Sequence, residues 1–415
     1  MIHIDKNLME HQEINIHSAI TALTCSLDLV GIDEVRHGKR VAMMAYQIAS
    51  ALDWQKTELL SILHAGMLHD CGVAKTHEHK QLTASMEWDG ADAHAERGAA
   101  FLSACPPLAH LALEIRYHHT RWEQLANLPL EDKTRLRANL LFLADRIDVL
   151  QAPYINTEKI LTQAPQIIDF LQTLSGKLFA PQLITAFKSI ATSQAFWLSM
   201  ESDYLDEDIR SLGMQIDPIT LNFYDQRELA RLFSRVVDAK SPYTEQHSER
   251  VALVARQLAS DFGFHGMQLE QIEIAGLLHD IGKLRVSEEI IDKPGRLNPD
   301  ERASMQRHSY DTYRILQRVF AHTKIPVWAG FHHENLLGKG YPFKTSGQEQ
   351  DLECRIISVA DIFQALCQNR PYRASMPLPD ILKDLQHRVE AGELDPQVVG
   401  KLTANAPAFY QLAIN

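Results

Sequence analysis

Histidine stands out among the residue types that could do chemistry, because the chain of 415 residues contains 20 of them. It is the commonest metal ligand in proteins, and its charge changes near neutral pH. In the C-terminal half, histidines and aspartates recur among the apolar residues of predicted helices. The candidate metal ligands there are His247, His279, Asp280, His308, His332, His333 and Asp361.

The number of these polar residues favours a metal centre over ordinary packing. A single histidine on an apolar helix face is usually a hydrogen-bonded core residue. Seven imidazoles and carboxylates on successive helices would converge when the helices pack, and burying so many unpaired polar groups would be costly. A metal satisfies such groups together, and the cores of helical bundles hold centres of this kind. Asp280, directly after His279, can bridge two metal ions.

We therefore predict two divalent metal ions as cofactors. Nitrogen and oxygen ligands without thiolate favour Fe or Mn, while Zn, Co, Ni or Mg are also compatible with the set. The five cysteines form no CxxC pair, which argues against a zinc–thiolate site. The same cysteine usage fits a reducing compartment, so we expect a cytoplasmic protein.

The sequence around these residues occurs twice. Residues 65–72 read AGMLHDCG and residues 275–282 read AGLLHDIG, with six of eight positions identical. Other matched pairs follow at an offset that grows slowly along the chain, as a duplicated domain with small loop insertions would give. The repeated positions in the first copy are His37, His69, Asp70, His94, His118, His119 and Asp145.

Helical signals dominate the rest of the pattern. Asn298 followed by Pro299 and Glu301 is typical of a helix start, with a capping residue, a first-turn proline and a capping-box acid. Residues 352–366 also have helical spacing, and no convincing set of alternating strands occurs. We predict an all-α protein of two tandem helical bundles.

Two motifs give the second copy a family resemblance. Residues 279–283 read HDIGK, which matches the HDxGK signature, and residues 332–342 read HHENLLGKGYP, which matches HHExxxGxGYP. Residues 370–373, RPYR, resemble a further segment of the same family. From about residue 228 to 388 the chain thus resembles the HD-GYP family of bacterial cyclic-dinucleotide phosphodiesterases. Tyr243 stands where three-metal members carry Glu, which favours a two-metal site.

The resemblance implies HD-type bundles for both copies. On this basis residues 1–150 form a degenerate HD-like domain, residues 151–225 form its helical end and a connector, and residues 226–415 form the HD-GYP catalytic domain. The first copy has Val73 where the second has Lys283, and it lacks the GYP loop and the RPYR segment. We expect it to bind metal with weak or no catalysis; a second active site or a metal-free regulatory domain are the alternatives.

The activity implied by the resemblance is hydrolysis of cyclic di-GMP, 3′,3′-cyclic GMP-AMP or both to a linear dinucleotide. A hydroxide bridging two metals would attack phosphorus, with Asp280 and Lys283 as catalytic residues. Solvated charges or an ordinary turn are the alternatives for several of the substrate-binding candidates. Those candidates are Lys283, Lys339, Tyr341, Arg370 and Arg373.

Two other functions remain open at this stage. One is a non-catalytic signalling protein that binds cyclic dinucleotides, and the other is an HD phosphohydrolase of ordinary nucleotides. The net charge of −12 argues against a DNA or RNA footprint. No apolar run approaches 18 residues, so we expect no membrane span. A homodimer or a signalling-protein partner is compatible with the sequence.

Overall fold

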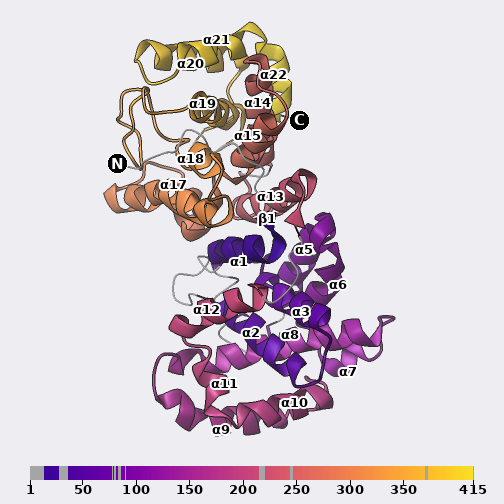
Figure 1. Ribbon diagram of the computed structural model, residues 1–415. Coiled ribbons are helices and arrows are strands. Elements are labelled where there is room, and N and C mark those ends of the chain that lie inside the picture. The colour runs from indigo at the N-terminus through magenta and orange to yellow at the C-terminus, as the bar shows by residue number, and fades with distance from the viewer. Residues whose placement is uncertain are drawn as a thin grey trace. The chain divides into compact units, whose positions relative to one another are not determined.

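The computed structural model describes residues 14–27, 36–76, 78, 81–82, 86–88, 90–214, 220–243, 246–369 and 373–414 (Figure 1). These residues are almost entirely helical, which confirms the all-α prediction. Two short strands, β1 (Ile14–Asn15) and β2 (Thr220–Leu221), pair with each other. None of the helices in the described residues is long and apolar enough to cross a lipid bilayer.

The chain forms two compact units: an N-terminal unit, Asn15–Ile219, and a C-terminal unit that comprises Thr220–Asn415 with the first residues of the chain. The helices of the N-terminal unit include four, α9 to α12, that fall in the predicted connector 151–225. The unit contains α1 (Ile16–Leu27), α2 (His37–Ser50), α3 (Lys56–Leu68), α5 (Ala91–Ser103), η1 (Pro106–Leu111), α6 (Ala112–Arg116), α7 (Trp122–Leu125), α8 (Asp132–Gln151), η2 (Ala152–Tyr154), α9 (Lys159–Gln172), α10 (Pro181–Ala191), α11 (Gln194–Leu198) and α12 (Ser202–Met214).

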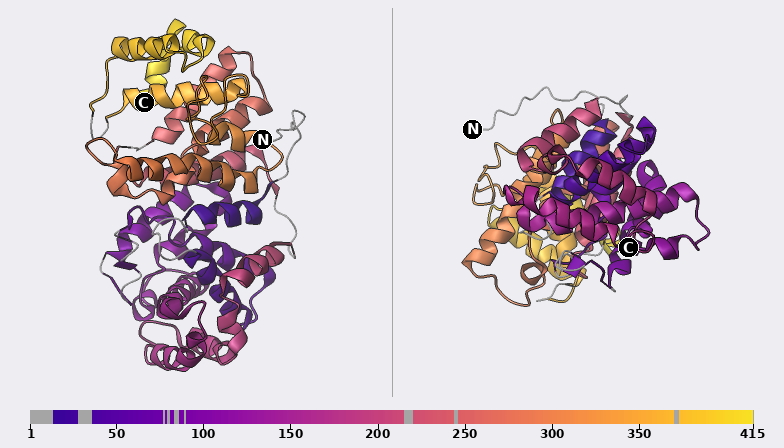
Figure 2. Two further views of the ribbon diagram at one scale, coloured as in Figure 1. Left: turned by 90° about the vertical axis from the view of Figure 1, so that its left-hand side faces the viewer. Right: turned by 90° about the horizontal axis from the view of Figure 1, so that it is seen from below.

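The C-terminal unit is built in layers, with α17 along one side and α20 and α21 along the opposite side (Figures 1 and 2). Helices α14, α15, α18 and α19 lie between them and form the core. The unit contains α13 (Phe223–Asp238), α14 (His247–Asp261), α15 (Met267–Leu278), η3 (Ile281–Arg285), α16 (Glu288–Ile291), α17 (Pro299–Val319), α18 (Ile325–Gly330), α19 (Leu352–Cys367), α20 (Leu378–Glu390), α21 (Pro396–Ala404) and α22 (Ala406–Ile414).

Helix α17 begins where the sequence predicts it. The Asn298 side chain accepts the Glu301 backbone N–H at 2.9 Å, and the Asn298 N–H donates to the Glu301 carboxylate at 2.8 Å. This reciprocal capping box satisfies two backbone donors that a helix start would otherwise leave open. It fixes the start of the long helix that carries His308.

Glycine allows a close helix–helix contact in each unit. A Cβ atom on Gly276 would lie 2.8 Å from the Cα atom of Ala252, and one on Gly66 would lie 2.5 Å from the Cα atom of Ala42. These glycines join α15 to α14 and α3 to α2, the helix pairs that carry the first ligands of each copy. The duplication therefore preserves a packing contact as well as the polar residues.

The substitution Gly276→Ala tests this contact. The added methyl group must push α14 and α15 apart, and overpacking of this kind typically costs about 1–3 kcal/mol of stability. Gly400→Ala in α21 is the matched control, because no atom lies within 4 Å of the position where its Cβ would stand. Both changes gain similar helix propensity. Urea unfolding midpoints should fall for Gly276→Ala alone, and equal stability of the two variants would contradict the packing argument.

Candidate metal centres

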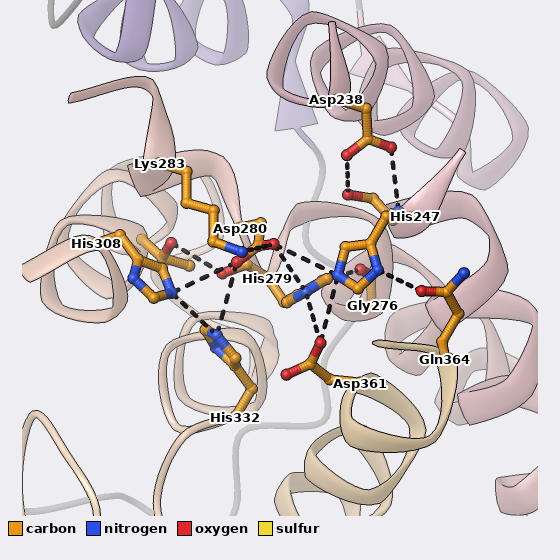
Figure 3. Close-up of polar contacts among 12 residues, drawn as sticks. Asp238, His247, Gly276, His279, Asp280, Lys283, His308, His332, Asp361 and Gln364 are labelled. Carbon is orange, nitrogen blue, oxygen red and sulfur yellow. Dashed lines mark hydrogen bonds and ion pairs between the residues drawn. The ribbon is translucent and has the colours of Figure 1, made fainter. Parts of the chain in front are cut away.

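All seven predicted ligands of the C-terminal unit come together around one carboxylate. His247 opens α14, His279 directly follows α15, Asp280 precedes η3 and Asp361 lies on α19. The other three ligands come from α17 and from the segment that follows α18. Figure 3 shows six of the side chains pointing toward a common centre. We call the seven residues the C-terminal cluster: His247, His279, Asp280, His308, His332, His333 and Asp361.

The two oxygens of Asp280 face different histidines. Oδ2 lies 3.5 Å from His247 Nε2 and 3.3 Å from His279 Nε2. Oδ1 lies 3.4 Å from His308 Nε2 and 3.7 Å from His332 Nε2. A carboxylate in this position can give one oxygen to each of two metal ions, as the adjacent His-Asp pair suggested.

Asp361 completes the cluster on one side. Its Oδ1 atom lies 3.3 Å from His247 Nε2, and its Oδ2 atom lies 3.9 Å from His333 Nδ1. His333 is the most accessible histidine of the set, with 28% of its side chain exposed. The cluster is therefore buried except at His333, where it opens outward.

The Nδ1 atoms of three ligand histidines are held by backbone carbonyls three residues earlier in the chain. Because a carbonyl only accepts, each Nδ1 donates, and the lone pair lies on the Nε2 atom that faces the centre. The three bonds join His279 to Gly276 (2.7 Å), His308 to Met305 (2.5 Å) and His332 to Ala329 (2.7 Å).

The donor set fits divalent metal ions. His279 Nε2 and Asp280 Oδ1 are buried without a hydrogen-bond partner, which is costly unless another group satisfies them. Burial lowers the pKa of His308 to about 3 and that of His333 to about 4, so both rings are neutral and can offer a lone pair. Burial alone would raise the pKa of Asp280, but the charges of His279 and Lys283 hold that pKa well below its usual range.

Lys283 lies beside this centre, one turn after Asp280. Its Nζ atom is 2.5 Å from Asp280 Oδ2, and its side chain is 17% exposed. Lys283 also lines a cavity of about 540 Å³ together with His333, Asp361 and Arg373. A ligand in this cavity would meet the metal ligands and a cation at the same time.

The other predicted substrate-binding residues lie at different places relative to this cavity. The Tyr341 ring packs on His333, with ring centroids 4.8 Å apart, and Arg373 lines the cavity. Lys339 is exposed on the same loop as Tyr341, outside the residues that line the cavity. Arg370 lies outside the described residues.

Sequence reasoning missed two residues that position the site. Glu334 accepts the backbone N–H groups of residues 343, 344 and 345 at 2.6, 3.0 and 3.1 Å, and so holds the loop that carries Tyr341. Gln364 accepts from His247 Nδ1 through Oε1 at 2.5 Å. The N-terminal unit has the same contact with a different residue type: Asp148 occupies the matching position and contacts His37 Nδ1 at 2.7 Å.

The N-terminal unit repeats the cluster around Asp70. Oδ1 lies 3.3 Å from His94 Nε2 and 3.8 Å from His118 Nε2, while Oδ2 lies 3.4 Å from His69 Nε2 and 3.7 Å from His37 Nε2. The N-terminal cluster consists of His37, His69, Asp70, His94, His118, His119 and Asp145.

The surroundings of the N-terminal cluster differ from those of the C-terminal cluster. Buried Val73 replaces the lysine, and the Arg146 guanidinium contacts Asp145 Oδ2 at 2.7 Å. Burial lowers the pKa of His37, but the hydrogen bond and charge of Asp148 outweigh it and raise that pKa to about 9. The ligand geometry is thus conserved while the nearby charges are not.

Comparison with known proteins places the chain in a family. Models described as HD domain match residues 35–150 and 231–398. Over 411 residues the chain is 39% identical to the 3′3′-cGAMP-specific phosphodiesterase 1 of Vibrio cholerae serotype O1, covering 97% of this chain and 94% of that protein. The chain belongs to the HD-GYP family of phosphodiesterases. HD domains are metal-dependent, in keeping with the two clusters.

A second relative and a solved structure are also similar to this chain. The 3′3′-cGAMP-specific phosphodiesterase 3 of the same organism is 33% identical over 267 residues, which is 64% of this chain and 56% of that protein. A crystal structure of a cyclic GMP-AMP-specific phosphodiesterase of V. cholerae shares the fold, with a TM-score of 0.64 over 95% of this chain and 98% of its own at 24% identity. The predicted family and tandem HD architecture are confirmed.

The substitution Gln364→Leu tests whether the residue that hydrogen-bonds to His247 affects the metal affinity of this HD-GYP site. Leucine removes the hydrogen bond that Gln364 makes with His247 Nδ1, and losing such a partner typically lowers metal affinity about 10–100-fold. Gln364→Glu is the matched control, since it keeps a hydrogen-bond acceptor and places a carboxylate there, as Asp148 does at the matching position of the N-terminal unit. Chelator competition should show weaker binding for Gln364→Leu only. Unchanged metal affinity in that variant would show that the hydrogen bond from His247 to Gln364 does not affect metal binding.

Proposed function

We propose that the C-terminal unit hydrolyses one phosphodiester bond of a bacterial cyclic dinucleotide and releases a linear dinucleotide. The position of Asp280 between two sets of imidazoles, beside Lys283 and an open cavity, carries this proposal. We favour 3′,3′-cyclic GMP-AMP as the substrate, because the relative named for it matches nearly the whole chain. Cyclic di-GMP is the alternative substrate.

Two divalent ions, with Fe or Mn favoured, would be held by the C-terminal cluster. His247, His279 and Asp361 would form one half of the site and His308, His332 and His333 the other, with Asp280 between them. When bound, such metals neutralise charge on a phosphodiester and activate a water molecule for attack. The lowered pKa values of His308, His332 and His333 and those of Asp280 and Asp361 favour neutral rings and ionised carboxylates, the protonation states that metal ligands require.

Residues of the chain itself would bind and orient the substrate. Lys283 would move from Asp280 to a phosphoryl oxygen or to the leaving oxygen, where it stabilises developing negative charge. Lys293, Arg296 and Arg373 line the same cavity and suit the second phosphate of a cyclic dinucleotide. Tyr341, packed on His333, would offer a ring face close to the reacting phosphate.

The N-terminal unit has a different role in this proposal. Its cluster would hold metal, but Val73 removes the cation that Lys283 supplies in the other unit. We assign hydrolysis of the cyclic dinucleotide to the C-terminal unit alone.

The substitution Asp280→Ala tests the hydrolytic assignment. Without the bridging carboxylate the two halves of the cluster separate, so the linear product should disappear with Mn or Fe. Cyclic GMP-AMP and cyclic di-GMP are incubated side by side and the products are separated by chromatography. Asp384→Ala is the control, because it also removes a paired carboxylate, 2.7 Å from Arg388 on α20. Full turnover by Asp280→Ala, or no product from the wild-type chain with either substrate, rejects the proposal.

The substitution Lys283→Val isolates the contribution of the cation and installs the residue found in the N-terminal unit. Removing one stabilising donor at a developing charge typically lowers kcat about 10²–10³-fold. The metal content should stay at the wild-type level, because Lys283 is not a ligand. Lys401→Val, which removes a lysine bound to the Asp261 carbonyl, is the control. A kcat within a few fold of wild type would remove Lys283 from the mechanism.

A further inference from the structure

The N-terminal unit contains a cavity of its own beside its metal cluster. Its volume is about 540 Å³, within the usual range for sites that bind small molecules. The residues that line it combine aromatic rings with arginines next to one histidine of the cluster. Those that matter here are Trp88, Arg116, Tyr117, His119, Arg121 and Arg146.

Arg146 is the central cation of this cavity. Its side chain is 2% exposed, and its guanidinium contacts Asp145 Oδ2 at 2.7 Å. At the matching position the C-terminal unit has Ile362, so the guanidinium is particular to the N-terminal unit. The C-terminal unit instead places Lys283 on Asp280, where the N-terminal unit has Val73. In each cluster a largely buried cation therefore contacts a carboxylate. In the C-terminal unit it is the central aspartate, and in the N-terminal unit it is the second aspartate.

His119 connects the cavity to the metal cluster. Its side chain is 7% exposed, and it lines the cavity. Like Arg146, it also reaches Asp145, with Nδ1 3.8 Å from Oδ2. Because His119 is one of the predicted metal ligands, a phosphate in the cavity would lie next to the metal site.

The other two arginines of the cavity, Arg116 and Arg121, are paired with acidic residues. Arg121 forms two bonds of 2.7 Å to Glu87, and Arg116 forms one of 2.8 Å to Glu96. Their charges are largely balanced by these acids at the rim. Arg146 contacts Asp145 at the edge of the cluster, and a guanidinium has five N–H donors, so it can contact a carboxylate and a phosphate at the same time.

The aromatic rings suit a nucleoside. The Trp88 ring lies over Gly90, where a Cβ atom would be 2.3 Å from ring atom Cζ2. Tyr117 lies at the same cavity wall, with the Arg116 guanidinium 5.8 Å from its ring centroid. Flat ring faces beside a phosphate-binding cation are a common arrangement for stacking a base.

We propose that this cavity is a nucleotide-binding site, with the phosphate at Arg146 and the N-terminal cluster and the base at Trp88 and Tyr117. It is separate from the C-terminal hydrolytic site. The substitution Arg146→Ile, which installs the residue type of the C-terminal unit, should therefore affect nucleotide binding without changing hydrolysis.

The experiment uses the full chain loaded with Mn and carrying Asp280→Ala, which disables the C-terminal cluster. Titration calorimetry measures binding of inorganic phosphate and of GMP. GMP should bind about tenfold or more tightly than phosphate, since stacking adds to the phosphate contact. Adding Arg146→Ile should weaken both ligands about tenfold or more. Adding Trp88→Ala should weaken GMP and leave phosphate unchanged.

The controls separate binding from folding. Arg135→Ile removes another guanidinium from α8 and should leave both affinities unchanged, while Arg146→Lys should retain more phosphate binding than Arg146→Ile. Metal content and the melting temperature show whether each variant remains folded and loaded. Unchanged binding in Arg146→Ile, or GMP no tighter than phosphate, overturns the proposal. Cyclic-dinucleotide hydrolysis by Arg146→Ile with Asp280 intact tests the C-terminal function separately.

Discussion

The structure of the C-terminal unit depends on the Asp280 carboxylate, whose two oxygens face different pairs of imidazoles. His247 and His279 approach one oxygen from α14 and the end of α15, while His308 and His332 approach the other from α17 and from the segment after α18. Four parts of the chain must therefore keep their relative positions for the C-terminal cluster to form. The glycine-mediated contact between α14 and α15 and the capping box of α17 both serve this requirement, because each fixes the end or spacing of a ligand-bearing helix.

Features determined by neighbouring residues could be predicted from the sequence. The start of α17 follows from Asn298 and Glu301, whose bonds span three positions. The prediction that Asp280 is a metal ligand follows from its place beside His279 in a motif that occurs twice. Convergence of the clusters follows from the same logic, since amphipathic helices with histidines among their apolar residues must bring them into the core. The short pairing of β1 with β2 was missed, because two-residue strands leave no alternation to detect.

Features determined by packing between distant residues could not be predicted in this way. Gln364 and His247 are 117 positions apart, and only the folded contact of α14 with α19 shows that one orients the other. Lys339 is a predicted substrate-binding residue; the structure places it exposed on its loop and outside the residues that line the cavity. The direction of a side chain on an irregular loop depends on bonds such as those of Glu334 to three backbone amides, which no spacing rule encodes.

Comparison of the two units shows which parts of the site can change independently. The two clusters share one geometry: in each, four histidines approach the oxygens of the central aspartate, and the fifth histidine approaches the second aspartate. Losing one of these partners would leave buried charge unpaired. The cation is under no such constraint, since it contacts a carboxylate oxygen from outside the ligand set. Lys283 contacts the central Asp280, whereas Arg146 contacts Asp145 beside a cavity with aromatic walls. In the functions proposed above, this difference in the position of one cation separates phosphate binding in the N-terminal unit from hydrolysis in the C-terminal unit.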